Sequence, residues 1–323
     1  MAGKDLRIVF MGTPDFAVAS LKALVEGGYN VVGVITAPDK PAGRGKLLSE
    51  SAVKQYAVKN NLLVLQPEKL KNQEFIDELM NLHADLQVVV AFRMLPETVW
   101  AMPRLGTFNL HGSLLPQYRG AAPLNWAIIN GEIKTGVTTF LLDHEIDTGK
   151  ILFKQEIEIG ENDTVGEVHD RLMEIGAELV VKTIDAISER SIQPVPQSEL
   201  VAYSEIKHAP KIFKEDCKID WSKSAESIRN LIRGLSPYPT AWTVMTNNKT
   251  GEEIQVKIFF ALKYNSVKKS TLGSIESDGK TFLNAACGDG WLQITDLQIA
   301  GKKRMKTEEF MRGFQQINNY SFK

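Results

Sequence analysis

The first part of the chain alternates short apolar runs with segments whose apolar residues recur every three or four positions. Short β-branched runs predict buried strands, and the three- to four-residue spacing predicts helices. Leu86–Phe92, with three consecutive valines, is typical of a strand buried on both faces. The alternation predicts an α/β fold, with a mostly parallel sheet covered by helices on both faces. Strands are expected at Leu6–Met11, Val31–Thr36, Leu86–Phe92, Gly106–His111 and Val137–Leu142, and helices at Phe16–Glu26 and Ser51–Asn60.

A long amphipathic helix is predicted to end the first domain. Thr164 and Glu167 have the spacing of a capping box, which marks a helix N-terminus. Behind them, residues on one helical face recur every three or four positions: Val168, Leu172, Ile175, Leu179, Thr183 and Ile187. Proline and serine then break the pattern, so we interpret residues 190–208 as a linker between domains at 1–189 and 209–323.

The pattern after the linker is different. Ser224–Gly234 has the spacing of a short helix, and the other apolar runs are separated by polar turns such as Gly288-Asp-Gly290. Antiparallel strands are expected at Ile254–Leu262, Thr281–Ala286 and Trp291–Leu297. The second domain is therefore expected to be a small β-barrel.

Composition limits the classes of function. The chain has 323 residues and 43% hydrophobic residues, enough for two cores. Its two cysteines, Cys217 and Cys287, form no metal-binding motif, so no metal site is expected. Few cysteines, no apolar run of membrane-spanning length and no signal-peptide pattern favour a cytoplasmic protein.

The charges are unevenly distributed. Residues 1–208 have 20 Lys+Arg against 27 Asp+Glu, a net charge of −7, whereas residues 209–323 have 18 against 12, a net charge of +6. Chance unevenness of a solvated surface would explain this equally well. The alternative is a basic C-terminal half that binds a polyanion.

Two polar residues end the strand Gly106–His111. Asn109 and His111 project to the same face, because side chains alternate along a strand. Ligands of open α/β sheets bind at the C-terminal ends of parallel strands. A structural histidine, with the asparagine capping the next turn, is the alternative to a catalytic pair.

Acidic residues follow the strand Val137–Leu142. We expect this loop at the same sheet edge as His111, where a carboxylate would hydrogen-bond the imidazole, fix its tautomer and favour its charged form. Asp147 precedes a Thr-Gly turn and is preferred, although geometry leaves Asp143 and Glu145 open; His144 on this polar loop is more simply solvated.

An amide, an imidazole and a carboxylate include no strong nucleophile. They suit direct attack by a substrate amine on a bound acyl group, with Asn109 donating to the developing oxyanion and His111 transferring a proton. A single glycine and Pro14 near the N-terminus disfavour dinucleotide binding. The Gly/Pro-rich loop 38–47 is either solvated or, through its basic residues, suited to a phosphate backbone.

The chain resembles bacterial methionyl-tRNA formyltransferases over essentially its full length. The Asn-x-His-x-Ser-Leu-Leu-Pro core marks formyltransferases that use 10-formyltetrahydrofolate, and the loop around Arg44 with the C-terminal motifs narrows the resemblance to the tRNA enzymes. One departure is Ala91–Pro96: family members often have Ala-Tyr-Gly here, followed by apolar residues and a proline, whereas this run is one residue shorter and contains Arg93. The matching stretches are Phe10–Phe16, Pro38–Lys46, Asn109–Pro116, Tyr118–Pro123, Asp147–Gly149, Ile219–Trp221, Pro237–Pro239, Ala241–Trp242 and Gly301–Lys303.

The resemblance implies a Rossmann-like domain followed by an OB-like barrel. It also implies transfer of the formyl group of 10-formyltetrahydrofolate to the α-amine of methionine on initiator tRNA. By the same resemblance, Asn109, His111 and Asp147 are catalytic. The folate contacts are then Ser113, Leu114, Leu115 and Pro116, and the tRNA contacts are Arg44, Lys46, Lys302 and Lys303.

Two other functions remain as alternatives. A formyltransferase acting on glycinamide ribonucleotide would not need a basic second domain, and one acting on an amino-sugar nucleotide would have a different one. A non-catalytic tRNA-binding protein would not need Asn109, His111 and Asp147 together. Nothing in the pattern indicates obligate assembly, so a monomer is expected.

Overall fold

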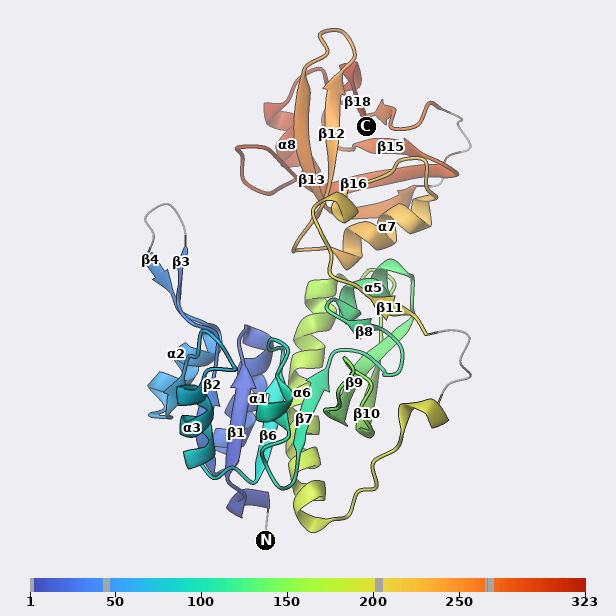
Figure 1. Ribbon diagram of the computed structural model, residues 1–323. Helices are drawn as coiled ribbons and strands as arrows, with labels where there is room; N and C mark the ends of the chain where they lie inside the picture. The colour runs from blue at the N-terminus through green and yellow to red at the C-terminus, as the bar shows by residue number, and fades with distance from the viewer. Residues whose placement is uncertain (1–2, 43–46, 201–205, 265, 267–269) are drawn as a thin grey trace. The chain divides into compact units, whose positions relative to one another are not determined.

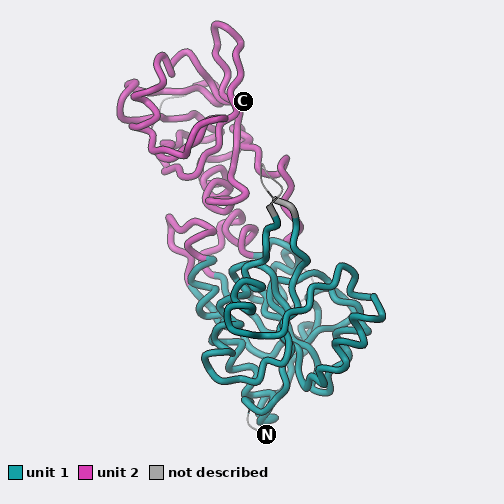
Figure 2. The backbone as a smooth tube through the Cα atoms, turned by 90° about the vertical axis from the view of Figure 1, so that its left-hand side faces the viewer, with its two compact units in different colours: residues 1–123, 135–157, 169–208 teal, residues 124–134, 158–168, 209–323 magenta. Residues whose placement is uncertain are grey.

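The computed structural model describes residues 3–42, 47–200, 206–264, 266 and 270–323. The chain divides into two compact units, shown in Figure 2. Unit 1 consists of residues 1–123, 135–157 and 169–208, and unit 2 of residues 124–134, 158–168 and 209–323. The division does not follow chain order, because two internal segments belong with the C-terminal residues.

Unit 1 is built on a seven-stranded sheet of order β10-β9-β7-β6-β1-β2-β5 (Figure 1). The prediction of a mostly parallel sheet is confirmed, since β5, β2, β1, β6 and β7 run parallel; β9 pairs antiparallel with β7. The strands are β1 (Ile8–Gly12), β2 (Val31–Ile35), β5 (Val64–Leu65), β6 (Leu86–Val90), β7 (Thr107–His111), β9 (Lys134–Leu141) and β10 (Ile151–Glu158).

Helices cover the two faces of this sheet. Phe75 of α3 and Val99 of α4 pack with Met11 and Val89 on one face. On the other face, Gly176 of α6 lies so close to Leu110 of β7 that a β-carbon on it would come within 2.8 Å of the leucine Cδ2. The helices are α1 (Asp15–Glu26), α2 (Ala52–Lys59), α3 (Gln73–Asn81), α4 (Glu97–Trp100), α5 (Pro123–Ile129) and α6 (Val165–Glu189).

The predicted capping box begins α6. The Glu167 carboxylate accepts the Thr164 backbone N–H at 2.8 Å, and the Thr164 hydroxyl accepts the Glu167 N–H at 3.4 Å. Two short ladders lie outside the main sheets. They are β3 (Lys40–Ala42) with β4 (Leu47–Ser49), and β8 (Arg119–Gly120) with β11 (His208–Ala209).

Unit 2 contains a nearly closed antiparallel barrel of order β14-β15-β16-β13-β12-β18, with β17 beside β16. A bridge between Ser274 and Ser321 joins the two ends of this order. The predicted tight turn is confirmed, since Cys287 pairs with Gly290. The strands are β12 (Ala241–Asn247), β13 (Glu253–Tyr264), β14 (Ile275–Glu276), β15 (Asn284–Cys287), β16 (Gly290–Ile299), β17 (Met305–Lys306) and β18 (Tyr320–Phe322), and the helices α7 (Ala225–Gly234) and α8 (Thr307–Gly313).

Two buried arginines of α7 explain why residues 158–168 belong to unit 2. Arg229 donates to the Glu161 carbonyl and, at 2.9 Å, to Asn162 Oδ1. Arg233 donates to the Asp163 carbonyl at 3.3 Å, and burial together with Arg229 lowers the pKa of its guanidinium. Carbonyls of this segment thus accept hydrogen bonds from both cations.

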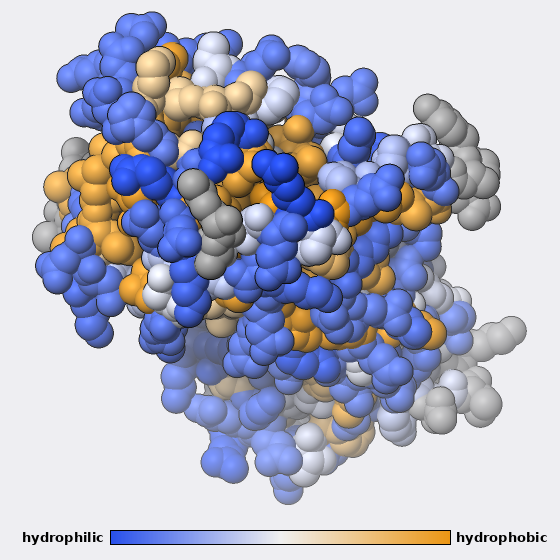
Figure 3. All heavy atoms as spheres, turned by 90° about the horizontal axis from the view of Figure 1, so that it is seen from below, coloured by the Kyte–Doolittle hydropathy of each residue, from blue (hydrophilic) through white to orange (hydrophobic). Residues whose placement is uncertain are grey.

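The molecular surface mixes polar and apolar residues on the face drawn in Figure 3, as is usual for folded proteins. Within the described ranges, no helix combines the length and the apolar character that crossing a bilayer requires.

Candidate active site

The predicted polar pair lies at the C-terminal end of β7. Asn109 pairs with Val89 of β6 and Phe140 of β9, so its side chain is on the sheet face covered by α3 and α4. The His111 ring meets the Phe140 ring edge-on, with the centroids 6.4 Å apart. His111 is 6% exposed and Asn109 is half-buried. Both side chains therefore occupy one face, as the strand alternation predicts.

The tautomer of His111 is set by a backbone carbonyl. Its Nε2 lies 2.9 Å from the backbone carbonyl oxygen of Tyr118. A carbonyl oxygen can only accept a hydrogen bond. Nε2 must therefore bear the proton. In the neutral ring, Nδ1 is then the nitrogen that has a lone pair and can accept a proton.

Asp147 faces this Nδ1. The distance from Nδ1 to Asp147 Oδ2 is 3.9 Å, which is an ion-pair distance and too long for a hydrogen bond. Oδ2 instead accepts the Gly120 N–H at 2.9 Å. The expectation that Asp147 fixes the tautomer by hydrogen bonding is thus wrong, because Tyr118 does so. The carboxylate can still stabilise an imidazolium by its charge, since both side chains are largely buried.

Asp147 reaches His111 by an unexpected route. Because β9 runs antiparallel to β7, Leu141 lies beside Phe108, whereas His111 lies beside Thr138. The strand thus ends at the far end of β7 from His111, and the expected meeting of the acidic loop with His111 depends on the path of the loop itself. The loop 142–150 returns to His111 across the sheet face covered by α4, and Leu142 packs in the cluster formed there.

The contacts of this loop distinguish its candidate residues. His144 meets the ring of Trp100 at 5.4 Å, and its Nε2 lies 3.7 Å from Glu97, so it points away from His111. Among the described residues, no carboxylate other than that of Asp147 lies within 4.0 Å of the His111 ring nitrogens. The structure thus separates Asp147 from Asp143 and Glu145.

The side-chain amide of Asn109 makes no hydrogen bond within the described part of the chain. It is half-buried, on the same face as His111. A half-buried amide without a protein partner is costly unless water or a ligand satisfies it. Its N–H is therefore available to a substrate oxygen.

The run Ser113–Pro116 is mostly turned into the protein. Ser113 and Leu115 are fully buried, Pro116 is buried, and Leu114 is half-buried. The Ser113 hydroxyl donates to the Gln117 carbonyl at 2.7 Å, and Thr138 donates to the Ser113 carbonyl at 2.6 Å. The Thr138 bond anchors the loop to β9, and the bond from Ser113 to Gln117 lies within the loop. In the structure, residues 113–116 therefore mainly hold in place the loop that contains Tyr118.

Of the four predicted tRNA contacts, two lie within the described residues. Arg44 and Lys46 lie outside the described residues, between β3 and β4. Lys302 and Lys303 are exposed on the turn between β16 and β17. Lys303 Nζ lies 3.0 Å from Glu309 Oε1, and its side chain is 77% exposed. Both lysines are therefore accessible to a partner.

Arg93, the departure from the family pattern, is directed to a neighbouring loop. It donates to the carbonyls of Glu68, at 2.8 Å, and Pro67. Burial lowers the pKa of its guanidinium. Its visible contacts are therefore structural, and they tie the segment after β6 to the segment after β5.

Sequence reasoning missed two contributors to this site. The Tyr118 carbonyl gives no signal in the sequence, because every residue has one. Gln197 lies in the segment interpreted as a linker, yet it is buried and bonded to the Asp147 loop. The only sequence signal for these contributors was the Tyr118-Arg-Gly motif. Its three residues bond to His111, Gln197 and Asp147.

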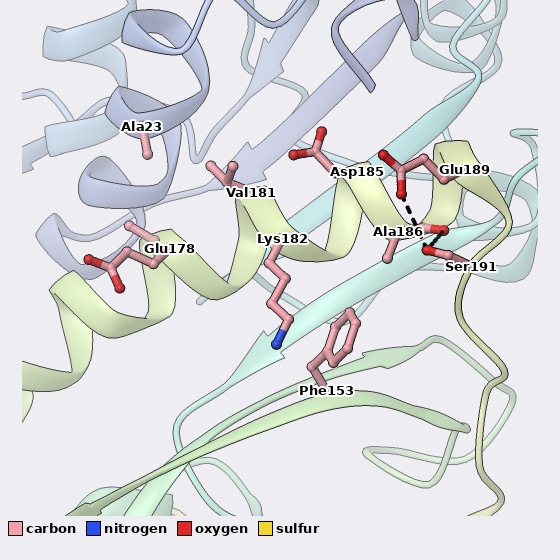
Figure 4. Close-up of a pocket in the computed structure, with 10 residues that line it drawn as sticks. Ala23, Phe153, Glu178, Val181, Lys182, Asp185, Ala186, Glu189 and Ser191 are labelled. Carbon is pink, nitrogen blue, oxygen red and sulfur yellow. Dashed lines mark hydrogen bonds between the residues drawn. The ribbon is translucent and has the colours of Figure 1, made fainter. Parts of the chain in front are cut away.

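A separate cavity of about 630 Å³ lies among α1, α6 and β10 (Figure 4). Lys182 Nζ stands 4.5 Å from the centre of the Phe153 ring there. The cavity is on the α6 side of the sheet, opposite the face of Asn109 and His111. It offers neither an imidazole nor a side-chain amide. We therefore assign it no part in the chemistry.

The donor set at the candidate site is an amide, an imidazole and one carboxylate. In the parts of the chain that the structure describes, no three His, Cys, Asp or Glu side chains gather closely enough to hold a metal ion. What the arrangement can do by itself is donate to an oxyanion, accept a proton at Nδ1 and stabilise the resulting cation.

Comparison with known proteins identifies the family of the chain. Residues 6–184 match the family model described as formyl transferase, and residues 211–315 match formyl transferase, C-terminal domain. Relatives named methionyl-tRNA formyltransferase include one from Bacteroides fragilis, 57% identical over 323 residues, covering 100% of this chain and 99% of that one. One from Flavobacterium johnsoniae is 51% identical over 310 residues and covers 96% of each chain.

Solved structures share the fold. The sugar 3N-formyl transferase WlaRD superposes with a TM-score of 0.64 at 21% identity, covering 92% of this chain and 99% of that one. HypX from Aquifex aeolicus, solved with tetrahydrofolic acid, gives 0.63 at 19% identity, covering 97% of this chain and 47% of that one. The family-model matches and the full-length similarity to these relatives show that the chain belongs to the formyltransferase family, and within it to the methionyl-tRNA formyltransferases.

Proposed function

We propose that the chain transfers the formyl group of 10-formyltetrahydrofolate to the methionine α-amine of initiator Met-tRNA at the site formed by Asn109, His111 and Asp147. The observation that best supports this is one face holding an unpaired amide, a basic Nδ1 and a carboxylate 3.9 Å from it. Formyl transfer to an amine needs all three functions and no protein nucleophile.

The first step is attack of the uncharged amine on the formyl carbon. As the carbon–nitrogen bond forms, negative charge develops on the formyl oxygen, and the Asn109 amide donates a hydrogen bond to it. Such donors typically contribute about 10²–10³ in rate. The half-buried position of Asn109 strengthens this bond relative to the same bond in water.

His111 moves the proton. Its Nδ1 takes a proton from the attacking nitrogen, because Nε2 is already protonated and bonded to Tyr118. The imidazolium is stabilised by the Asp147 carboxylate. The proton then passes to the folate nitrogen as its bond to the formyl carbon breaks. The products are formylmethionyl-tRNA and tetrahydrofolate, and the enzyme returns to its starting protonation state.

Residues 209–323 and the segment around Arg44 are assigned to tRNA. The supporting observations are the net charge of +6 over residues 209–323 and the exposure of Lys302 and Lys303. Phosphates bind such lysines mainly through charge. We further propose that the chain acts as a monomer in the cytoplasm, where its two buried cysteines would remain reduced.

An acceptor comparison tests the proposal. Labelled formyl should pass from 10-formyltetrahydrofolate to initiator Met-tRNA, and not to glycinamide ribonucleotide or to an amino-sugar nucleotide. The His111→Ala variant should lose this activity in the same assay. Efficient transfer to either small acceptor, or no transfer to tRNA, would overturn the assignment.

A further inference from the structure

A buried glutamine holds the main chain that positions the Asp147 carboxylate. Gln197 is 4% exposed, and its amide nitrogen donates to the carbonyls of Asp147 and Gly149, at 2.9 Å each. Its amide oxygen accepts two hydrogen bonds from Arg119, from Nε at 3.1 Å and Nη2 at 2.7 Å. All four hydrogen-bonding positions of the carboxamide are thereby used, which fixes its orientation.

The backbone of Asp147 needs such support. Its φ is +57°, a left-handed conformation that residues with a β-carbon adopt reluctantly. Such residues keep a left-handed conformation only when several contacts of the surrounding structure hold them there. The next turn is equally constrained, since a β-carbon on Gly149 would lie 1.7 Å from the Leu141 oxygen. The bonds from Gln197 span both points of constraint.

Three consecutive residues connect this support to His111. The Tyr118 carbonyl accepts from His111 Nε2, the Arg119 guanidinium donates to Gln197, and the Gly120 N–H donates to the Asp147 carboxylate. One short segment therefore fixes the imidazole, the carboxylate and the amide that holds the carboxylate's backbone. Loss of Gln197 would remove the hydrogen bond to the Asp147 carbonyl. The bond between His111 Nε2 and the Tyr118 carbonyl, which sets the tautomer, would remain.

We propose that Gln197, held by Arg119, is a positioning residue that keeps the Asp147 carboxylate opposite Nδ1 of His111. This inference rests on the proposed roles of Asp147 and His111. Gln197 touches neither reacting group, so it acts through the Asp147 backbone. Its loss should lower kcat rather than raise the KM for tRNA or folate, and its effect should disappear once Asp147 is already disabled.

The test uses the full-length enzyme and the isosteric variant Gln197→Glu. A carboxylate keeps the shape and its attraction to Arg119, but it places an acceptor against the two carbonyls that the amide now donates to. We expect kcat to fall at least about 10-fold, with both KM values within about 2-fold and Tm within a few degrees. The pH profile of kcat should approach that of Asp147→Asn, and Gln197→Glu/Asp147→Asn should be no slower than Asp147→Asn.

Two further variants keep the test decisive. Gln73→Glu makes the same chemical change at an exposed position of α3 and should leave kcat unchanged. If Gln197→Glu fails to fold, Arg119→Lys replaces it, because it removes one of two donors to Gln197 and should give a smaller fall in kcat with unchanged KM.

The outcomes separate the inference from the proposed function. If His111→Ala and Asp147→Asn keep wild-type kcat, the proposed function of the site is wrong. If those variants are impaired while Gln197→Glu keeps wild-type kcat, raises only a KM, or multiplies its loss with Asp147→Asn, then the positioning role of Gln197 is wrong.

Discussion

The His111 imidazole faces the Asp147 carboxylate across 3.9 Å, although the strand that leads to Asp147 ends beside Phe108, at the opposite end of β7. The loop 142–150 covers that distance. Asp147 is then held by Gly120 at its carboxylate and by Gln197 at its backbone. The pairing on which the proposed chemistry depends is therefore a property of the loop and its anchors, and it has measurable consequences.

Replacement of Asn109 tests the oxyanion donor. Asn109→Ala should lower kcat by about 10²–10³, because the developing charge loses its hydrogen bond. Binding of the folate donor, measured separately by titration calorimetry, should change little, because the missing bond strengthens only in the transition state. An Asn109→Ala enzyme that turns over at near wild-type rate would exclude this role.

A double-mutant cycle tests the coupling of His111 and Asp147. His111→Ala should lower kcat by about 10²–10⁴, the usual contribution of a general base. Since Asp147 acts through the imidazole, Asp147→Asn/His111→Ala should be little slower than His111→Ala alone. Single-turnover formyl transfer measures all four enzymes. Fully multiplicative losses would show that the carboxylate acts independently.

The exposed lysines of unit 2 should neutralise phosphates of the tRNA. In Lys302→Ala/Lys303→Ala, the log–log dependence of tRNA affinity on salt should become shallower by about 0.7–0.9 for each phosphate that is no longer neutralised. Thermal stability should hardly change, because the ion pair of Lys303 with Glu309 is exposed. Lys280→Ala, on another exposed turn of unit 2, is the matched control. Equal salt slopes in all three proteins would contradict the assignment.

Asp296 should make the stability of unit 2 depend on pH. Burial alone would raise the pKa of this carboxyl, but hydrogen bonds from Arg304 and Lys306 outweigh burial and lower it. Because the folded pKa is below the unfolded value of about 3.9, the stabilisation is present above that value and is lost as pH falls through the folded pKa.

The matching experiment is denaturant unfolding of wild type and Asp296→Asn. Near pH 7 the variant should lose about 1.5–3 kcal/mol, the range for hydrogen bonds to charged groups. The difference should shrink below about pH 4. A difference that stays constant down to about pH 3, below the unfolded pKa, would mean that packing, rather than the charge, accounts for the loss.

The sequence by itself determined several of the elements and the first half of the site. The three valines of β6, the capping box of α6 and the tight turn between β15 and β16 all follow from local patterns, because strand and helix periods and cap bonds involve neighbours in the chain. The shared face of Asn109 and His111 follows from the same two-residue period.

Only the tertiary structure decided how the site is completed. The direction of β9 depends on which strand it pairs with, and that pairing is settled by long-range burial that no local pattern records. The tautomer of His111 depends on a backbone carbonyl, which residue type does not encode. Gln197 lies in a segment without periodicity, and its role exists only because the fold brings it to the Asp147 loop. Catalytic residue types can be recognised in a sequence, but the groups that hold them act through distances that the chain sets only when it is folded.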